Sequence, residues 1–149
     1  GDAVVERHGD RVAERHDAAL EELVVVGSQR IGHELLAGSG QPLLELAATI
    51  ALTHHERWDG TGYPQGLKGE QIPVFGRIVA IADVFDALMN RRPYKAAMSA
   101  SQSLAIMAEE RGKAFDPELL DCFFLAQFEI LRIMDLYADE RGAVADILA

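Results

Sequence analysis

The sequence predicts an all-α fold, and three observations support that prediction. Apolar residues recur at helical spacing in successive stretches, so each stretch can bury one face against a core. Residues typical of helix starts, such as Pro42 and the pair Asp116-Pro117, stand between these stretches. No run alternates apolar and polar residues as a half-buried strand does, and 149 residues suit one domain with a sizeable core.

The first part of the chain predicts three helices. Residues 2–16 place apolar residues among charged ones at helical spacing, and residues 17–37 form a second helical stretch. Pro42 suits the first turn of the next helix, whose apolar residues continue to about His55.

An irregular loop follows, which we name the GYP loop (residues 58–73) after its segment Gly62-Tyr63-Pro64. It contains four glycines and two prolines without any periodicity. A loop of that length inside a compact domain is usually functional or disordered. Three helices are expected after it: from Pro73 through Met89, from a capping box at Ser99 to near Gly112, and from the N-cap Asp116 to about Tyr137.

The composition excludes several classes of protein. The net charge of −10, without a basic stripe, argues against binding to a nucleic acid polymer. No run approaches the roughly 20 apolar residues of a membrane span. The single cysteine, Cys122, excludes a disulfide framework and favours a reducing, cytoplasmic setting. Because Cys122 lies in an apolar run without a basic neighbour, we expect a buried and inert thiol.

His54 and His55 form the first unusual feature. Adjacent helical residues point about 100° apart, so only one of them can occupy the centre of an apolar face. A surface histidine beside a partly buried one is therefore one interpretation. The pair also ends an apolar helix and leads into the GYP loop, where two imidazoles can converge on a metal ion.

Asp83 is the second feature, because its helix is apolar on nearly every side and should be largely buried. A buried carboxylate is unfavourable unless it is paired or bound to a cation. Asp83 is therefore expected to pair with Arg77, to make a helix-cap contact, or to bind a metal ion opposite the histidines. Asp86, one turn further on, can orient a histidine ligand.

A basic segment follows that helix. Arg91, Arg92 and Lys95 lie within five residues of a chain that has only 14 lysines and arginines. Pro93 fixes a turn that can bring Arg92 and Lys95 together on a phosphate. A solvated basic turn at a helix end is the other interpretation.

The residues from His54 to Pro64 together resemble the signature of the HD-GYP family, H-H-E-x-x-D-G-x-G-Y-P, at every fixed position. The resemblance covers roughly residues 28–138 of a single domain, with residues 1–27 divergent or truncated and residues 139–149 a C-terminal tail. It implies an HD-domain-like helical bundle with a long GYP loop. Further matching segments are Gly66-Leu67, Gly69, Ile72-Pro73, Arg77-Ile78, Ala82 to Leu88, Arg92 to Lys95 and Phe115 to Pro117.

The resemblance implies a metal-dependent phosphodiesterase that hydrolyses the bacterial second messenger cyclic-di-GMP. Such proteins use two or three divalent metal ions, often iron or manganese. The expected metal ligands are His54, His55, Asp83 and His8. The expected substrate-binding residues are Arg92, Lys95, Tyr63 and Pro64, and the characteristic GYP-loop residues are Asp59, Gly60, Gly62, Tyr63 and Pro64.

The resemblance also implies partners in signal transduction. The GYP loop of the family serves as a docking surface for diguanylate-cyclase domains, and receiver domains often precede such domains. A homodimer is also conceivable, because the last predicted helix has a broad apolar surface, although packing on its own core is favoured. That surface comprises Leu119, Phe123, Phe124, Phe128 and Ile130.

The resemblance breaks down near the N-terminus. The family opens with E-x-x-x-H, but Val4 stands where the glutamate belongs, four residues before His8. The His-Asp pair that names the family is not found, because His16-Asp17 lacks the Gly-Lys that should follow. Ser28 replaces a further histidine ligand. We therefore expect the chain to lack the helix that bears this pair, and no catalytic residue can be assigned.

Three interpretations remain open. The chain can be an active phosphodiesterase, or a catalytically degenerate module that binds cyclic-di-GMP or docks partner proteins such as diguanylate cyclases. It can also be a phosphohydrolase of the wider HD superfamily that acts on another nucleotide. Loss of residues between about 12 and 28 would produce the same departure from the family, and a Cα step well above about 3.8 Å would reveal it.

Overall fold

The structure is a computed structural model that describes residues 27–90 and 97–148, with side chains as far as Tyr137. Within these residues every regular element is a helix, apart from an isolated bridge between Arg111 and Phe115. The predicted all-α fold class is confirmed for this part of the chain. The expected first helix, and the expected absence of the helix with the His-Asp pair, concern residues outside the described ranges.

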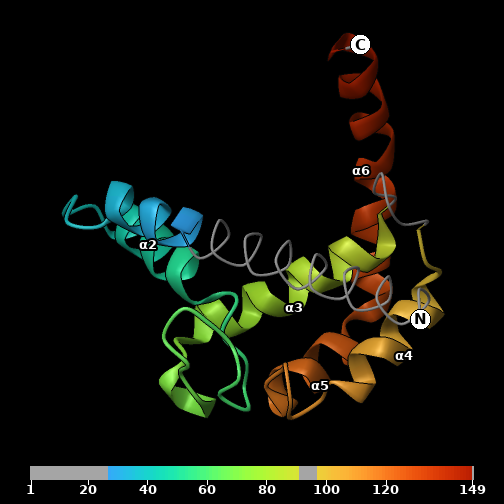
Figure 1. The fold of residues 1–149 in the computed structure, drawn as a ribbon. Coiled ribbons are helices and arrows are strands. Elements are labelled where there is room, and N and C mark those ends of the chain that lie inside the picture. The colour runs from blue at the N-terminus through green and yellow to red at the C-terminus, as the bar shows by residue number, and fades with distance from the viewer. Residues whose placement is uncertain (1–26, 91–96, 149) are drawn as a thin grey trace, which may run out of the picture.

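The described chain begins with a helical hairpin. Residues 27–36 are helical, and α2 (Pro42–Thr53) runs back along them, with Pro42 at its first turn as predicted. His33 Nδ1 donates to the carbonyl oxygen of Ala48 at 3.1 Å and ties the two helices together. Figure 1 shows this pair extending to one side of the other helices.

The GYP loop leads from α2 to α3 (Val74–Met89), and it is not wholly irregular, because it contains the short 3₁₀ helix η1 (Gly69–Gln71). α2 and α3 approach closely at Gly76. A Cβ atom on Gly76 would lie 2.3 Å from Thr53 Oγ1, so only glycine permits this contact. The crossing places the C-terminal end of α2 directly beside α3.

The expectation that α3 is buried on nearly every side is wrong. One face is buried, through residues such as Ala80, Ile81 and Phe85, whereas Asp83 and Ile78 are exposed. The sequence pattern misleads because valine, isoleucine and phenylalanine occur on both faces of this helix. Among them, Phe75 is 48% and Ile78 44% exposed.

Three helices complete the fold: α4 (Ala100–Glu109), α5 (Pro117–Leu125) and α6 (Gln127–Leu148). The predicted capping box at Ser99 and the Asp116 N-cap are both present. The predicted single helix ending near Tyr137 is wrong, because the chain breaks at Ala126 and α6 then continues to Leu148. Alanine favours helices, so tertiary packing rather than local propensity imposes this break.

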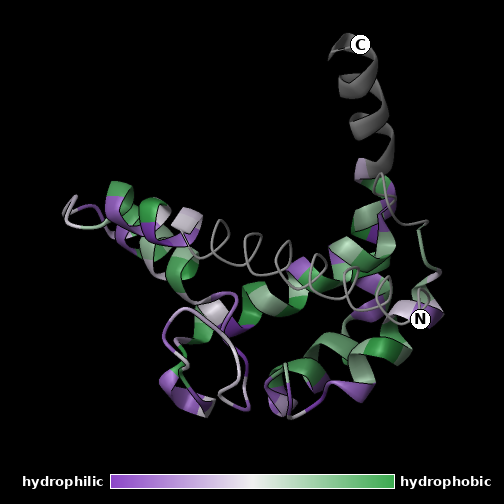
Figure 2. Ribbon diagram, viewed as in Figure 1, coloured by the Kyte–Doolittle hydropathy of each residue, from purple (hydrophilic) through white to green (hydrophobic). Residues whose placement is uncertain are grey.

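The core consists of a set of side chains that we name the apolar cluster. α5 and α6 both pack on it, and the bend at Ala126 lets them do so in succession. Figure 2 shows hydrophobic segments of α3, α4 and α5 facing one another around this region. The apolar cluster comprises Ile81, Phe85, Leu88, Met107, Phe115 and Leu120.

The apolar surface predicted on the last helix serves mainly this core. Leu119, Phe123, Phe124 and Ile130 pack against the apolar cluster, whereas Phe128 is 81% exposed. Cys122 is exposed, so the expected buried thiol is wrong; α5 buries Leu120 but turns its cysteine outward. None of the helices in the described part of the chain is long and apolar enough to cross a membrane.

Candidate functional site

A cavity of about 220 Å³, which we name the histidine cavity, lies where α2 ends beside α3. Four of the residues predicted for the site line it: His54, His55, Tyr63 and Asp83. They come from the end of α2, the GYP loop and the middle of α3, segments that the close contact at Gly76 brings together. The structure thus gathers residues that are almost thirty positions apart in the sequence.

His54 is the C-cap of α2. Its Nδ1 atom lies 2.8 Å from the carbonyl oxygen of Ile50. Since a carbonyl oxygen only accepts, Nδ1 carries the proton in this contact, and Nε2 keeps the lone pair that a metal ion or an acid needs. His55 also lines the cavity: α2 ends at Thr53, so both histidines follow the helix and the 100° separation of a continuous helix does not apply.

His55 packs against both His54 and Tyr63. The imidazole centroids of the two histidines are 4.1 Å apart, and the Tyr63 ring stacks on His55 at 5.3 Å. The Tyr63 hydroxyl lies 3.3 Å from His55 Nδ1. Burial lowers the pKa of His55 and nearby His54 lowers it further, while the negative Asp83 raises it in part. A lowered pKa favours the neutral imidazole, the form that binds metals.

Asp83 lines the same cavity, although it is exposed rather than buried. The expected alternative, an ion pair between Asp83 and Arg77, is wrong. Arg77 Nη1 instead lies 2.6 Å from Asp116 Oδ2, and Arg77 Nε donates to the carbonyl oxygen of Ile72. Asp86, which was expected to orient a histidine, accepts a hydrogen bond from the Asn90 amide at 2.8 Å.

The side chains of His54, His55 and Asp83 are of the types that bind metal ions, but they do not form a complete metal site. Two imidazoles and one carboxylate are ligands that iron and manganese accept. Within residues 27–90 and 97–137, however, no three side chains of histidine, cysteine, aspartate or glutamate converge closely enough to hold a metal ion. His8, Arg92 and Lys95 lie outside the described residues. The described residues therefore supply part of a possible metal site.

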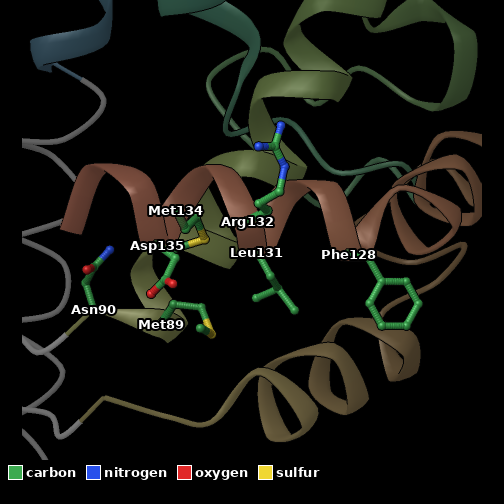
Figure 3. Close-up of a pocket in the computed structure, with 7 residues that line it drawn as sticks. All are labelled: Met89, Asn90, Phe128, Leu131, Arg132, Met134 and Asp135. Atoms are coloured by element: carbon green, nitrogen blue, oxygen red, sulfur yellow. The ribbon is translucent and has the colours of Figure 1, made fainter.

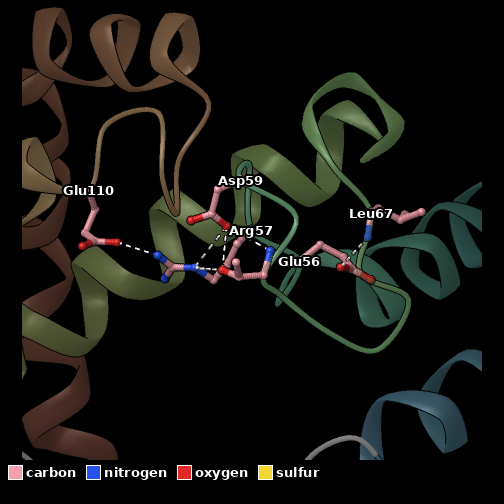
Figure 4. A network of polar contacts seen from close by, with 6 residues as sticks. Glu56, Arg57, Asp59, Leu67 and Glu110 are labelled. Carbon is pink, nitrogen blue, oxygen red and sulfur yellow. Dashed lines mark hydrogen bonds and ion pairs between the residues drawn. The ribbon is translucent and has the colours of Figure 1, made fainter.

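Glu56 is a functional residue that the sequence reasoning missed. Its side chain is only 4% exposed, and its two carboxylate oxygens accept hydrogen bonds from the backbone N–H groups of Gln65, at 2.7 Å, and Leu67, at 3.0 Å. Figure 4 shows the Glu56 carboxylate directed at Leu67. The available signal was an acidic residue between His55 and the GYP loop. Glu56 holds the part of the GYP loop that follows Tyr63.

Arg57 fixes the beginning of the same loop. Its Nη2 atom donates to Glu110 Oε2 at 2.8 Å, and its Nε atom donates to Thr61 Oγ1 at 3.1 Å (Figure 4). Asp59 accepts hydrogen bonds from the backbone and the hydroxyl of Thr61, and these contacts lower the pKa of Asp59. The loop is thus attached to the end of α4 by side chains.

Two glycines of the loop are required by its geometry. A Cβ atom on Gly62 would lie 2.3 Å from the backbone nitrogen of Arg57, and Gly60 has a φ of +87°. The Tyr63–Pro64 peptide bond is cis. Tyr63 lines the histidine cavity, whereas Pro64 lines a separate cavity of about 210 Å³ together with His33. His33 therefore lies outside the histidine cavity.

The backbone of the loop pairs with the segment between α4 and α5. Trp58 N–H donates to the carbonyl oxygen of Ala114 at 3.1 Å, and Asp59 N–H donates to that of Lys113 at 2.9 Å. The Arg77 guanidinium lies over the Trp58 ring, 5.7 Å from its centroid. These contacts use backbone groups of the loop that would otherwise have to face water.

A larger cavity of about 590 Å³ lies between α6 and the end of α3 (Figure 3). Met89 and Asn90 line it from α3, and Phe128 and Asp135 line it from α6. None of the predicted site residues with a described side chain lines this cavity. Its remaining described lining residues are Leu131, Arg132 and Met134.

Comparison with known proteins identifies relatives that agree with the resemblance found in the sequence. A family model described as "HD domain" matches residues 12–119. A cyclic di-GMP phosphodiesterase response regulator of Xanthomonas campestris pv. campestris is 50% identical over 104 residues, which are 70% of this chain and 28% of the relative. A cyclic di-GMP phosphodiesterase of Thermotoga maritima is 46% identical over 111 residues, 74% of this chain and 29% of the relative.

A solved structure supports the same grouping. A crystal structure of a cyclic GMP-AMP specific phosphodiesterase of Vibrio cholerae matches with a TM-score of 0.54 and 28% identity, over 66% of this chain and 22% of that one. The chain spans less than one third of the length of these relatives. Their similarity therefore concerns one part of longer proteins.

Proposed function

This chain belongs to the HD domain family, and from that premise we propose that it acts as a metal-dependent phosphodiesterase that hydrolyses cyclic-di-GMP. The resemblance to the HD-GYP branch is confirmed by relatives that are named cyclic di-GMP phosphodiesterases. The family depends on metal ions in general. Iron or manganese is our proposal for this chain, because both accept imidazole and carboxylate ligands.

The observation that carries the proposal is the shared cavity of His54, His55 and Asp83. His54 Nε2 is available because Nδ1 donates to Ile50, and the lowered pKa of His55 keeps its imidazole neutral. Asp83 supplies the negative charge that a cation needs. A bound metal ion would supply a water of lowered pKa as the nucleophile and would neutralise the developing charge on the phosphate.

The residues around the cavity have distinct parts in this proposal. His54, His55 and Asp83 would hold the metal, and His8 would add a ligand from the N-terminal segment. Tyr63 contacts His55 and would keep its ring in place. Arg92 and Lys95 would bind the substrate phosphates, Arg92 through two parallel hydrogen bonds and Lys95 as a point charge.

The decisive experiment combines metal analysis with a hydrolysis assay on the purified chain. We expect at least one iron or manganese ion per chain and turnover of cyclic-di-GMP. The substitutions His54→Ala and Asp83→Asn should lower both metal content and turnover. His33→Ala is the matched control, because His33 lines the separate cavity and should change neither.

The same experiment distinguishes an active phosphodiesterase from a catalytically degenerate binding module. A wild-type chain with less than one metal ion, inert with added manganese or iron, would contradict the phosphodiesterase. The incomplete set of ligands among residues 27–90 and 97–137 is the observation that favours a degenerate binding module in that case. Binding of cyclic-di-GMP or of a diguanylate-cyclase domain would then be the activity to measure.

A further inference from the structure

Glu56 is a buried carboxylate in the wall of the histidine cavity. It is 4% exposed, and among the described residues no lysine or arginine forms an ion pair with it. Its oxygens instead accept from the backbone N–H groups of Gln65, at 2.7 Å, and Leu67, at 3.0 Å. A buried charge is unfavourable unless hydrogen bonds compensate it, so the carboxylate and these two N–H groups depend on each other.

A carboxylate matches this pair of donors better than an amide does. It offers two acceptor oxygens and no donor, whereas a glutamine side chain would turn one donor towards one of the N–H groups. Figure 4 shows the carboxylate directed at Leu67 across the loop. The segment that follows Tyr63 is therefore attached to the residue that directly follows His55.

The segment that precedes Tyr63 is attached at the same place. A Cβ atom on Gly62 would lie 2.3 Å from the backbone nitrogen of Arg57 and 2.6 Å from the Cα atom of Glu56, so the two stretches of backbone are in close contact. The Tyr63 N–H group donates to the carbonyl oxygen of His55 at 3.3 Å. Tyr63 is thus held between one attachment before it and another after it.

Tyr63 in turn contacts the His55 ring on its face and at Nδ1. The two rings lie 5.3 Å apart and 13° from parallel, and the Tyr63 hydroxyl lies 3.3 Å from His55 Nδ1. Because α2 ends at Thr53, no further helical turn fixes the position of His55. With Nδ1 occupied by Tyr63, Nε2 is the nitrogen of His55 that is left for a metal ion.

We propose that Glu56 is a positioning residue for His55: it fixes the loop so that Tyr63 stays against the imidazole and Nε2 is directed into the histidine cavity. Its effect on a metal ion rests on the proposed function, whereas the contact between the two rings can be measured without metal. Replacing a residue that orients a metal-binding histidine typically lowers metal affinity by about 10–100-fold. Glu56 acts one step further away, through Tyr63, so the lower end of that range is expected.

The first test measures manganese binding to the purified chain by titration calorimetry. Glu56→Gln removes one acceptor and should weaken binding by about tenfold. Glu56→Asp keeps the charge but is too short to hold both N–H groups, and should weaken binding as well. Glu70→Gln removes the same charge from an exposed residue of the same loop and should bind manganese as tightly as the wild type. Weaker binding in both glutamine variants with normal binding in Glu56→Asp would overturn the proposal, because charge alone would then explain the loss.

A double-mutant cycle with Tyr63→Ala separates positioning from a direct effect on the metal ion. If Glu56 acts through Tyr63, Tyr63→Ala by itself weakens manganese binding, and adding Glu56→Gln should change the affinity by less than about twofold. A full further loss in the Tyr63→Ala protein would overturn the proposal, because Glu56 would then act on the metal ion as a ligand or through its charge.

The contact between the rings of Tyr63 and His55 is the second readout. In NMR spectra of the metal-free chain, the nuclear Overhauser effect between these rings should be present in the wild type and in Glu70→Gln, and lost in Glu56→Gln. An unchanged ring contact in Glu56→Gln would overturn the proposal. Wild-type protein that binds no manganese would remove the proposed metal site alone, and the ring contact would then decide the role of Glu56. Glu56→Asp takes the place of Glu56→Gln in each test if circular dichroism shows that the latter does not fold.

Discussion

The GYP loop and the apolar cluster both involve α3 and the segment between α4 and α5, but different forces hold them. The loop is attached by buried or half-buried polar side chains, chiefly Glu56, Arg57 and Arg77, the last through the carbonyl oxygen of Ile72. The apolar cluster is held by side chains such as Met107 and Leu120, both 0% exposed. The loop pairs part of its backbone itself, as where Gly69 N–H donates to the carbonyl oxygen of Trp58 at 2.9 Å, and the Glu56 carboxylate accepts from two further backbone N–H groups.

This difference predicts which part of the molecule a substitution will destabilise. Loss of an apolar contact in the cluster should lower the stability of the whole domain, because several helices share it. Loss of one polar contact in the loop should release mainly that part of the loop. The site lies between the two regions, so its geometry depends on both.

The largest effect is expected where the two regions meet, at Arg77. Its ion pair with Asp116 is 2.6 Å long, and the two side chains are 17% and 5% exposed. Arg77→Met would leave the Asp116 carboxylate buried without its cation, and should lower the free energy of unfolding by about 3–5 kcal/mol. Urea denaturation measures this. Arg111→Met removes an ion pair whose partners are about half exposed, and should have a much smaller effect; equal losses would contradict the distinction.

Leu120→Ala tests the apolar cluster. Leu120 is fully buried, so the substitution should lower the free energy of unfolding by about 2–5 kcal/mol through lost burial and the cavity left behind. Leu125 lies on the same helix, is 86% exposed and serves as the control, because its replacement by alanine should be nearly neutral. The comparison would fail if Leu120→Ala released the loop amides of Gln65 and Leu67 while leaving global stability unchanged.

Glu56→Gln tests the loop by itself. The amide keeps one acceptor oxygen and loses the other, so one of the two backbone N–H groups loses its charged partner, at about 1–3 kcal/mol. Hydrogen exchange should accelerate at Gln65 or Leu67 and stay unchanged in α4 and α5. Glu70→Gln changes an exposed residue of the same loop and should leave these amides protected. Uniform acceleration across the domain would show that loop and cluster are not separable.

Tyr63→Phe should have the smallest effect on stability. The ring keeps its stacking on His55, and the loss of the hydroxyl contact at 3.3 Å should lower the free energy of unfolding by about 1 kcal/mol or less. Thermal denaturation measures this loss, and metal content measures the position of His55. Tyr137→Phe, at a 55% exposed residue, is the control. A loss as large as that of Leu120→Ala would mean that Tyr63 belongs to the core.

Local features of the fold could be predicted from the sequence because their causes are local. The start of α2 at Pro42, the capping box at Ser99 and the N-cap Asp116 all depend on atoms within about one helical turn. The break at Ala126 could not be predicted, because it depends on how α5 and α6 pack on the apolar cluster. The partner of Arg77 was also missed, since Asp116 is distant in the sequence and close only in the folded chain.

By itself, the sequence determined the helical class, the family and four of the residues that line the candidate site, since these are properties of residue types and their spacing. Only the tertiary structure decided that Asp83 is exposed and that Glu56 holds the GYP loop. Burial and hydrogen-bond partners depend on which helices pack together, and a periodic pattern does not specify this. The histidine site is formed by α2 crossing α3 at Gly76, where the absence of a side chain permits a contact that residue spacing does not reveal.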